Sequence, residues 1–175
     1  FGWDEDGSIY LTAHGRPIFR VRAQGGVAEQ LTVFEKGDMA HFSFQRVAGT
    51  REFLYSVQSE AQDGTGIYAS SLDNPRQRKR IVDAFSSSVY DGKRLIYQTG
   101  ERLFTVGYDP ATRRVASDSH PLEPQVAVYP FTGVGDFAAS REGTLIFRTG
   151  KTTSQRELAW FDREGNRQES LAQGM

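Results

Sequence analysis

The sequence predicts an all-β protein of the β-propeller class, and an internal repeat is the main reason. One unit occurs four times along the chain. It consists of a short polar turn with a glycine, then an apolar strand with an aromatic residue and, after a gap, a second apolar strand. The turn glycines stand 42, 43 and 51 residues apart, at Gly7, Gly49, Gly92 and Gly143. An aromatic residue follows each of them, at Tyr10, Tyr55, Tyr97 and Phe147. Self-similarity with a period in the low forties, carried by strands and turns, is typical of propeller blades.

Composition and periodicity support the same class. The 175 residues are enough for one domain with a core, and 18 glycines are typical of a turn-rich chain of short strands. No stretch repeats apolar residues at helical spacing over three turns, so we expect almost no helix. A β-sandwich is the competing all-β architecture. It would not explain why the order turn, strand, hairpin, strand, turn, strand recurs.

The charge and the cysteine content exclude several classes of function. A formal net charge of −1 and a pI near 6.4 provide no overall field that would attract nucleic acid or an anionic membrane. The absence of cysteine removes disulfides, thiolate nucleophiles and thiolate metal sites. No run approaches the roughly 18 apolar residues of a membrane helix, so we expect no transmembrane segment in this chain.

The start of the chain, Phe1-Gly2-Trp3, is typical of the end of a strand already in progress. We therefore expect the chain to be an excised piece of a longer protein. A leader, an anchor or a catalytic domain could lie outside it.

The first two blades are expected over residues 1–33 and 38–83. After the Asp4–Gly7 turn, the strands expected in the first blade are Ser8–Ala13, Ile18–Arg22 and Glu29–Thr32. The strands expected in the second blade are His41–Phe44, Glu52–Ser59, Ile67–Leu72 and Lys79–Val82. The second set, and the first set together with the strand that ends at Phe1-Gly2-Trp3, fit the four-stranded antiparallel unit of a propeller.

The last two blades are expected over residues 84–123 and 124–175. The strands expected in the third blade are Ser86–Tyr90, Leu95–Gln98, Leu103–Tyr108 and, after a break at Asp109-Pro110, His120–Leu122. The strands expected in the fourth blade are Gly135–Ala139, Thr144–Arg148, Leu158–Asp162 and Asn166–Leu171.

Several motifs carry a resemblance to a known repeat class. The Phe-Gly-Trp-x-x-Asp-Gly start, the run from Ile18 to Thr32 and the segment from Gly66 to Asp73 resemble TolB-type WD40-like (PD40) propeller repeats. Leu158-x-Trp160-Phe161-Asp162-Arg163-x-Gly165 is similar to a segment of bacterial propeller domains that follow serine/threonine kinase domains. The resemblance covers essentially the whole chain, although no copy has the Ser-Pro-Asp-Gly turn of the repeat.

This resemblance implies a fold and a kind of function. It implies about four blades of a larger, six-bladed propeller. We expect either further chain to complete the ring in the native protein or this piece to self-associate through its terminal blades. It implies a non-catalytic module that binds a protein or a small ligand at one face, as the sensor part of a receptor-like kinase. The alternative is the accessory propeller of a prolyl-oligopeptidase-type hydrolase. A periplasmic or cell-surface location follows from the resemblance alone.

We expect no catalytic residue, no metal and no cofactor in this chain. Asp4-Glu5-Asp6-Gly7 has the acid spacing that begins a calcium loop, but no glutamate follows the glycine at the required distance. The histidines His14, His41 and His120 fall in three different copies and share no ligand spacing. Ser86-Ser87-Ser88 lacks the Gly-x-Ser-x-Gly elbow of a nucleophilic serine. An enzyme in the propeller funnel would need acids, histidines or metal ligands converging from several blades.

The basic run from Arg76 to Arg80 is interpreted as a solvated outer blade edge, whose charges hinder pairing with other strands. It has no aromatic platform beside it, so we expect no nucleic-acid binding. The larger aromatics are interpreted as packing between neighbouring blades; these are Trp3, Phe42, Phe44, Tyr55, Tyr68, Phe104 and Phe147.

Recognition is expected in loops rather than strands. The candidate segments are the insertions Glu60–Gly66 and Thr149–Arg156 and the stretch Pro124–Gly133. The candidate binding residues are Tyr129, Phe131, Arg156 and Trp160, although core packing is the more ordinary role for Trp160.

Overall fold

The computed structural model describes residues 2–4, 6–61, 63–116, 118–129, 132, 134–150, 157–162 and 166–173. For residues 123–124, 157–161 and 167–173 it describes the backbone. Every regular element in these ranges is a β-strand, which confirms the predicted all-β class. Accordingly, the described residues form no helix that could cross a membrane.

The first sheet contains β1 (Gly2–Trp3), β2 (Ser8–Leu11), β3 (Phe19–Arg22) and β4 (Glu29–Gln30), hydrogen-bonded in that order. Gly2 and Trp3 pair with Tyr10 and Ile9, so the chain does begin on a strand of this sheet. The turn that follows is closed by Asp6, whose carboxylate accepts the Ser8 N–H at 2.8 Å.

The second sheet is the most buried and has the order β5 (Asp38–Arg46), β6 (Glu52–Ser59), β7 (Gly66–Ser71) and β8 (Asn74–Val82). All six residues of β7 are buried, because both faces of the sheet are covered by neighbouring sheets. The pairing of β5 with β6 shifts between Phe42 and Gln45, where Ser43 has a φ of 54°. This bulge bends the strand and alters which side chains share a face.

The third sheet is built on β9 (Ser88–Tyr90), β10 (Arg94–Thr99) and β11 (Arg102–Asp109). Its outer edge is shared by two strands, β12 (Arg114–Val115) and β13 (His120–Gln125), which pair with opposite halves of β11. The outer strand expected from His120 is therefore confirmed. The break predicted at Asp109-Pro110 is the turn that leads into β12.

The fourth copy differs from the expected single sheet. The described residues form one pair from β14 (Phe137–Ala139) and β15 (Leu145–Phe147), and a separate hairpin from β16 (Glu157–Phe161) and β17 (Arg167–Gln173). β14 and β15 are each three residues long and share three paired positions.

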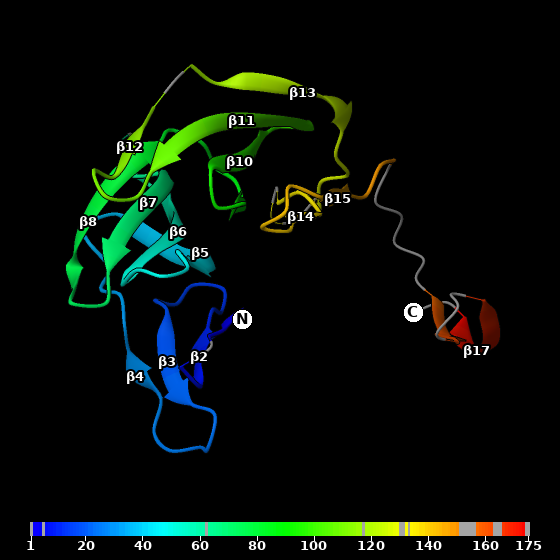
Figure 1. The fold of residues 1–175 in the computed structure, drawn as a ribbon. Coiled ribbons are helices and arrows are strands. Elements are labelled where there is room, and N and C mark those ends of the chain that lie inside the picture. Colours follow the sequence, from blue (N-terminus) through cyan, green and yellow to red (C-terminus); the bar gives the residue numbers. More distant parts are fainter. Residues whose placement is uncertain are drawn as a thin grey trace.

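The sheets follow one another along an arc, with β14 and β15 after the third sheet (Figure 1). One apolar cluster joins the first and second sheets through residues such as Tyr10, Phe53 and Tyr68. A second cluster joins the second and third sheets through residues such as Leu54 and Leu95. Burial of each such side chain stabilises the fold by roughly 1.5–3 kcal/mol.

Polar side chains also join the second and third sheets. The amide of Gln45 on β5 accepts the N–H of Tyr90 at 2.6 Å and donates to its carbonyl at 3.0 Å. Glu52 on β6 binds the Arg113 guanidinium through both carboxylate oxygens, at 2.5 and 2.8 Å. The repeats therefore stack in sequence order, as propeller blades do.

The four repeat glycines share one backbone conformation. Their φ angles are 75°, 72°, 99° and 86° at Gly7, Gly49, Gly92 and Gly143, all in the left-handed region that favours glycine. The repeat tyrosines are likewise equivalent in burial, with exposures of 0%, 1% and 8% at Tyr10, Tyr55 and Tyr97.

One of the aromatics assigned to blade packing lies elsewhere. Trp3 is 69% exposed, because it lies on the face of the first sheet that points away from the second sheet. Phe42 contacts Phe85 of the next repeat and also lines a pocket. Phe44, Tyr55, Tyr68 and Phe104 contact the buried clusters as expected.

Candidate functional site

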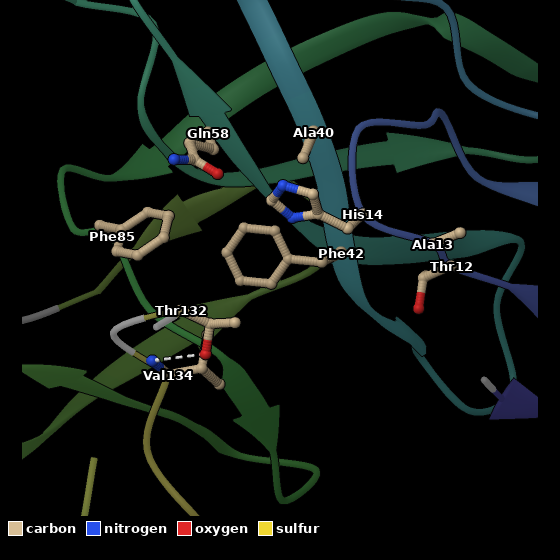
Figure 2. Close-up of a pocket in the computed structure, with 9 residues that line it drawn as sticks. All are labelled: Thr12, Ala13, His14, Ala40, Phe42, Gln58, Phe85, Thr132 and Val134. Carbon is tan, nitrogen blue, oxygen red and sulfur yellow. Dashed lines mark hydrogen bonds between the residues drawn. The ribbon is translucent and has the colours of Figure 1, made fainter. Parts of the chain in front are cut away.

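A cavity of about 570 Å³ draws its lining from all four sequence repeats (Figure 2). We call it the central pocket. It is lined by Thr12, Ala13, His14, Ala40, Phe42, Gln58, Phe85, Thr132 and Val134.

The fold brings these residues to the same end of successive sheets. Ala40 and Phe42 lie near the start of β5, and Gln58, which pairs with Ala40, lies near the end of β6. The segment from Thr12 to His14 follows β2 directly. Phe85 and Val134 belong to the connections that lead into β9 and β14. The pocket is therefore made by strand ends and connections, the parts of a propeller that vary most freely.

The lining is apolar with a few polar groups. The rings of Phe42 and Phe85 meet edge to face, with centroids 5.5 Å apart. Figure 2 shows the imidazole of His14 and the amide of Gln58 on the same side of the Phe42 ring. Neither a carboxylate nor a Lys or Arg side chain is among the lining residues in the described part of the chain. Such a pocket favours an uncharged ligand with a flat or apolar surface.

A buried hydrogen-bond network lies beside this pocket. It is centred on His41, which stands between the pocket residues Ala40 and Phe42 in β5. The Ile18 N–H donates to the hydroxyl of Thr32 at 2.9 Å, and that hydroxyl lies 2.8 Å from Nδ1 of His41. On the other side of the ring, Nε2 of His41 lies 3.0 Å from a carboxylate oxygen of Asp38. Because Asp38 can only accept, Nε2 carries the proton, and the Thr32 hydroxyl donates to Nδ1.

Arg78 completes the network from the outer strand β8. Its guanidinium donates to both carboxylate oxygens of Asp38, at 2.6 and 3.2 Å, and reaches Glu35 at 3.0 Å. It also lies over the ring of Tyr68, 4.6 Å from the centroid. The Arg78 side chain is 8% exposed, so the interpretation of residues 76–80 as a solvated edge is wrong at this position. The reason is that a side chain on the inner face of β8 meets the buried carboxylate of Asp38.

The protonation states of these groups follow from burial and pairing. Burial lowers the pKa of His41, and the neighbouring Asp38 only partly opposes that shift. Burial by itself would raise the pKa of Asp38, but hydrogen bonds from Arg78, the Glu35 backbone and His41 lower it overall. The ion pair with Asp38 outweighs burial at Arg78 and raises the pKa of its guanidinium. The network thus holds a neutral imidazole beside a tight carboxylate–guanidinium pair.

Thr32, His41 and Asp38 have the connectivity of a hydroxyl–imidazole–carboxylate triad. Thr32 and His41 are both 0% exposed, and the Thr32 oxygen is already engaged by the Ile18 N–H. A nucleophile must be reachable by its substrate and aligned with its base. The burial of Thr32 therefore favours a structural role, in which the network joins the first sheet to the second.

The residues that the sequence predicted for binding are only partly described. Tyr129 is half-buried, and its N–H donates to the Val134 carbonyl at 2.9 Å, so it lies at the edge of the segment that supplies Thr132 and Val134. Phe131 and Arg156 lie outside the described residues. Trp160 lies in β16, where the backbone alone is described.

The three histidines occupy separate places. His14 lines the central pocket, His41 is buried in the network and His120 is exposed on β13. Within the described residues, no group of three or more histidine or acidic side chains could hold a metal ion. The Asp4 carboxylate, in the turn whose acid spacing begins like a calcium loop, pairs with Arg46 of β5 at 3.0 Å.

The spacing of two phenylalanines is a sequence signal for the central pocket. Phe42 and Phe85 stand 43 residues apart, which is one repeat period; Phe42 lies within β5 and Phe85 precedes β9, the first strands of their sheets. An aromatic that recurs at the repeat period is compatible with packing between blades as well as with a shared pocket.

Comparison with solved structures supports the architecture. A regucalcin from Agrobacterium tumefaciens, described as a calcium-binding protein, superposes with a TM-score of 0.54 over 96% of this chain. The fold is a β-propeller. At 13% identity the likeness shows the fold alone, and the chain spans 57% of the length of that six-bladed protein. No family profile matches the chain, and no curated protein matches it either. The TolB-type and kinase-linked resemblance therefore stays a prediction from motifs.

Proposed function

We propose that this chain is a non-catalytic binding module that holds an uncharged, ring-bearing group in the central pocket. The group belongs to a small ligand or to a partner protein. The observation that carries this proposal is the pocket itself, whose lining comes from four repeats and combines two phenylalanine rings with amide, imidazole and hydroxyl groups. Ligand sites are typically concave and apolar, with a few polar groups that orient the ligand.

The lining chemistry supports an uncharged ligand rather than a hard cation. Calcium takes six to eight oxygen ligands, several of them carboxylates. The described lining of the central pocket contributes oxygens only from Thr12, Gln58 and Thr132 among its side chains. The calcium binding of the regucalcin is therefore not a basis for our proposal.

The resemblance to kinase-linked propellers supports a more specific version, in which the module is the extracytoplasmic sensor part of a receptor-like kinase. In that version, ligand binding at the central pocket is the input signal. A kinase domain encoded in the same gene would agree with this version, and a hydrolase domain there would contradict it.

A bulky substitution at the pocket wall tests the proposal. Ala13 is exposed and lines the pocket, so Ala13→Trp should fill the cavity without disturbing the core. The matched control is Ala111→Trp, at an exposed position in the turn between β11 and β12. The probe is a library of uncharged cyclic and aromatic fragments, followed by ligand-observed NMR.

We expect fragments that bind the parent chain and Ala111→Trp but bind Ala13→Trp at least tenfold more weakly, with unchanged melting temperatures. A second variant, Gln58→Glu, should also weaken binding because it introduces a charge into the pocket. The proposal is wrong if no fragment binds, or if fragments bind equally to Ala13→Trp.

A further inference from the structure

The polar side chains of the central pocket keep most of their hydrogen-bonding capacity free. Thr12, His14 and Gln58 make no side-chain hydrogen bond to any residue that the structure describes. The hydroxyl oxygen of Thr132 accepts the Val134 N–H at 3.4 Å, and its O–H is still available as a donor. Polar groups inside a packed protein are normally paired. Four groups left open around one cavity are therefore suited to a polar ligand.

These four side chains offer donors and acceptors together. The threonine hydroxyls can donate and accept, and the amide of Gln58 has two N–H donors and a carbonyl oxygen. The imidazole of His14 has at least one N–H donor in either protonation state. In Figure 2 the four groups are placed around the Phe42 ring. A ligand that satisfies them needs several polar groups along its rim, and each must be able to donate or accept.

The apolar part of the lining is not a slot for a flat aromatic ring. The planes of Phe42 and Phe85 are 62° apart and the rings meet edge to face, so they do not form two parallel walls. The face of a phenyl ring carries partial negative charge and attracts C–H groups, which carry partial positive charge. This arrangement favours a saturated ring with C–H groups on its faces over a planar ring held between two aromatics.

Competition with water narrows the ligand class further. A ligand that displaces ordered water without replacing its hydrogen bonds loses affinity. The hydroxyl groups of a sugar reproduce both the donors and the acceptors of water, and the C–H groups of its ring remain free to contact the phenylalanines. A charged substituent would be buried without a partner, because the described lining has no carboxylate, Lys or Arg.

We propose that the central pocket binds a neutral sugar. One pyranose unit contacts the two phenylalanine rings through its C–H groups and the four polar side chains through its hydroxyl groups. This inference rests on the proposed function, because it names the ligand class of the same pocket. The unit is a free monosaccharide or the terminal residue of a neutral glycan. The cavity of about 570 Å³ has the size of an ordinary small-molecule site.

Calorimetric titration of the chain with defined sugars tests the proposal. The panel consists of glucose, galactose, mannose, xylose and N-acetylglucosamine, with their methyl glycosides and neutral oligosaccharides. Tighter binding of the oligosaccharides would identify a glycan end, and equal binding of the monosaccharide would identify a free sugar. We expect at least one neutral sugar to bind. Its uronic acid and its amino sugar should bind about tenfold more weakly or not at all.

Two substitutions separate sugar binding from apolar binding. Gln58→Leu removes the amide at nearly constant volume, so it should weaken sugar binding about tenfold and leave the binding of phenol unchanged or tighter. Thr12→Val should also weaken sugar binding, and it keeps the test decisive if circular dichroism shows that Gln58→Leu does not fold. The matched control is Gln77→Leu, at an exposed position on β8 outside the pocket lining, which should bind sugar like the parent chain.

Four results would overturn the proposal. If uncharged aromatic fragments bind in the central pocket and no sugar competes with them, the binding module stands and its ligand class is wrong. If neither fragments nor sugars bind, the proposed function fails as well. If a sugar binds equally to the parent chain, Gln58→Leu and Ala13→Trp, its site lies elsewhere. If a uronic acid binds as tightly as the neutral sugar, the ligand class is not neutral.

Discussion

The hydroxyl of Thr32 lies 2.8 Å from Nδ1 of His41, and this hydrogen bond joins the end of the first sheet to the first strand of the second. Both side chains are buried. From His41 the network continues through Asp38 to Arg78 on the outer strand, so one chain of polar contacts crosses the whole second sheet. Buried polar networks of this kind rigidify a structure when every member is satisfied.

Removal of the Thr32 hydroxyl should weaken the junction between the first two sheets. Thr32→Val keeps the shape of the side chain but leaves the Ile18 N–H and Nδ1 of His41 without a partner. We expect a loss of about 1–3 kcal/mol in the free energy of unfolding, which corresponds to a fall of about 2–4 °C in melting temperature per kcal/mol. Thr144→Val, at an exposed position before β15, is the matched control. Equal melting temperatures for the two variants would contradict the role of the network.

Arg78 and Lys79 are neighbours on β8 with different roles. Arg78→Gln leaves the Asp38 carboxylate, which is 1% exposed, without its cation, and should cost about 3 kcal/mol or more. The Lys79 side chain donates to the Thr112 carbonyl from an exposed position, so Lys79→Gln should leave stability nearly unchanged. Urea unfolding of both variants measures the difference, and a large loss for Lys79→Gln would reverse our assignment.

Stability should fall on mild acidification because of His41. Its pKa in the folded protein lies below the ordinary 6.5, so the unfolded chain binds a proton first as the pH falls. The His41 contribution is therefore complete above about pH 6.5 and is lost below it. The pKa of Asp38 lies below its ordinary 3.8, so its contribution is lost only in stronger acid. Melting temperatures between pH 7.5 and 5 should fall for the parent chain and for His120→Gln. The fall should be smaller for His41→Gln, and an equal slope in all three would exclude His41 as the cause.

The repeat glycines should tolerate asparagine better than valine. Gly7 has a φ of 75°, and a Cβ built there would meet no atom within 4 Å. The cost of a substitution therefore comes from the backbone conformation and not from crowding. We expect Gly7→Val to lose about 1–2 kcal/mol and Gly7→Asn distinctly less, because asparagine adopts the left-handed region more readily. Thermal melts that agree within a degree for the two variants would contradict this turn conformation.

Most of the blade architecture could be predicted from the sequence, because it rests on local patterns. Alternating apolar residues and a glycine turn at a period of about 42 specify strands and hairpins within one repeat. The outer strand at His120 was found in this way. The fourth copy was predicted less well, since its described strands form two separate pairs and not one sheet.

The buried network and the central pocket could not be predicted, because each joins residues from different repeats. Asp38 and Arg78 are 40 residues apart, and their contact depends on how β8 folds back toward the start of β5. The run of five basic and polar residues from Arg76 to Arg80 is predicted to be solvated from its sequence. The structure places the side chain of one of them, Arg78, on the inner face of β8. The same applies to Phe42, whose pocket also needs lining residues from the other repeats.

The sequence by itself determined that this chain is a repeat of short antiparallel strands with glycine turns, because strand periodicity and positive φ are properties of neighbouring residues. The tertiary structure decided which side chains are buried as ions and which line the central pocket. Those outcomes depend on the packing of one sheet against the next, and packing brings together residues that no local pattern relates.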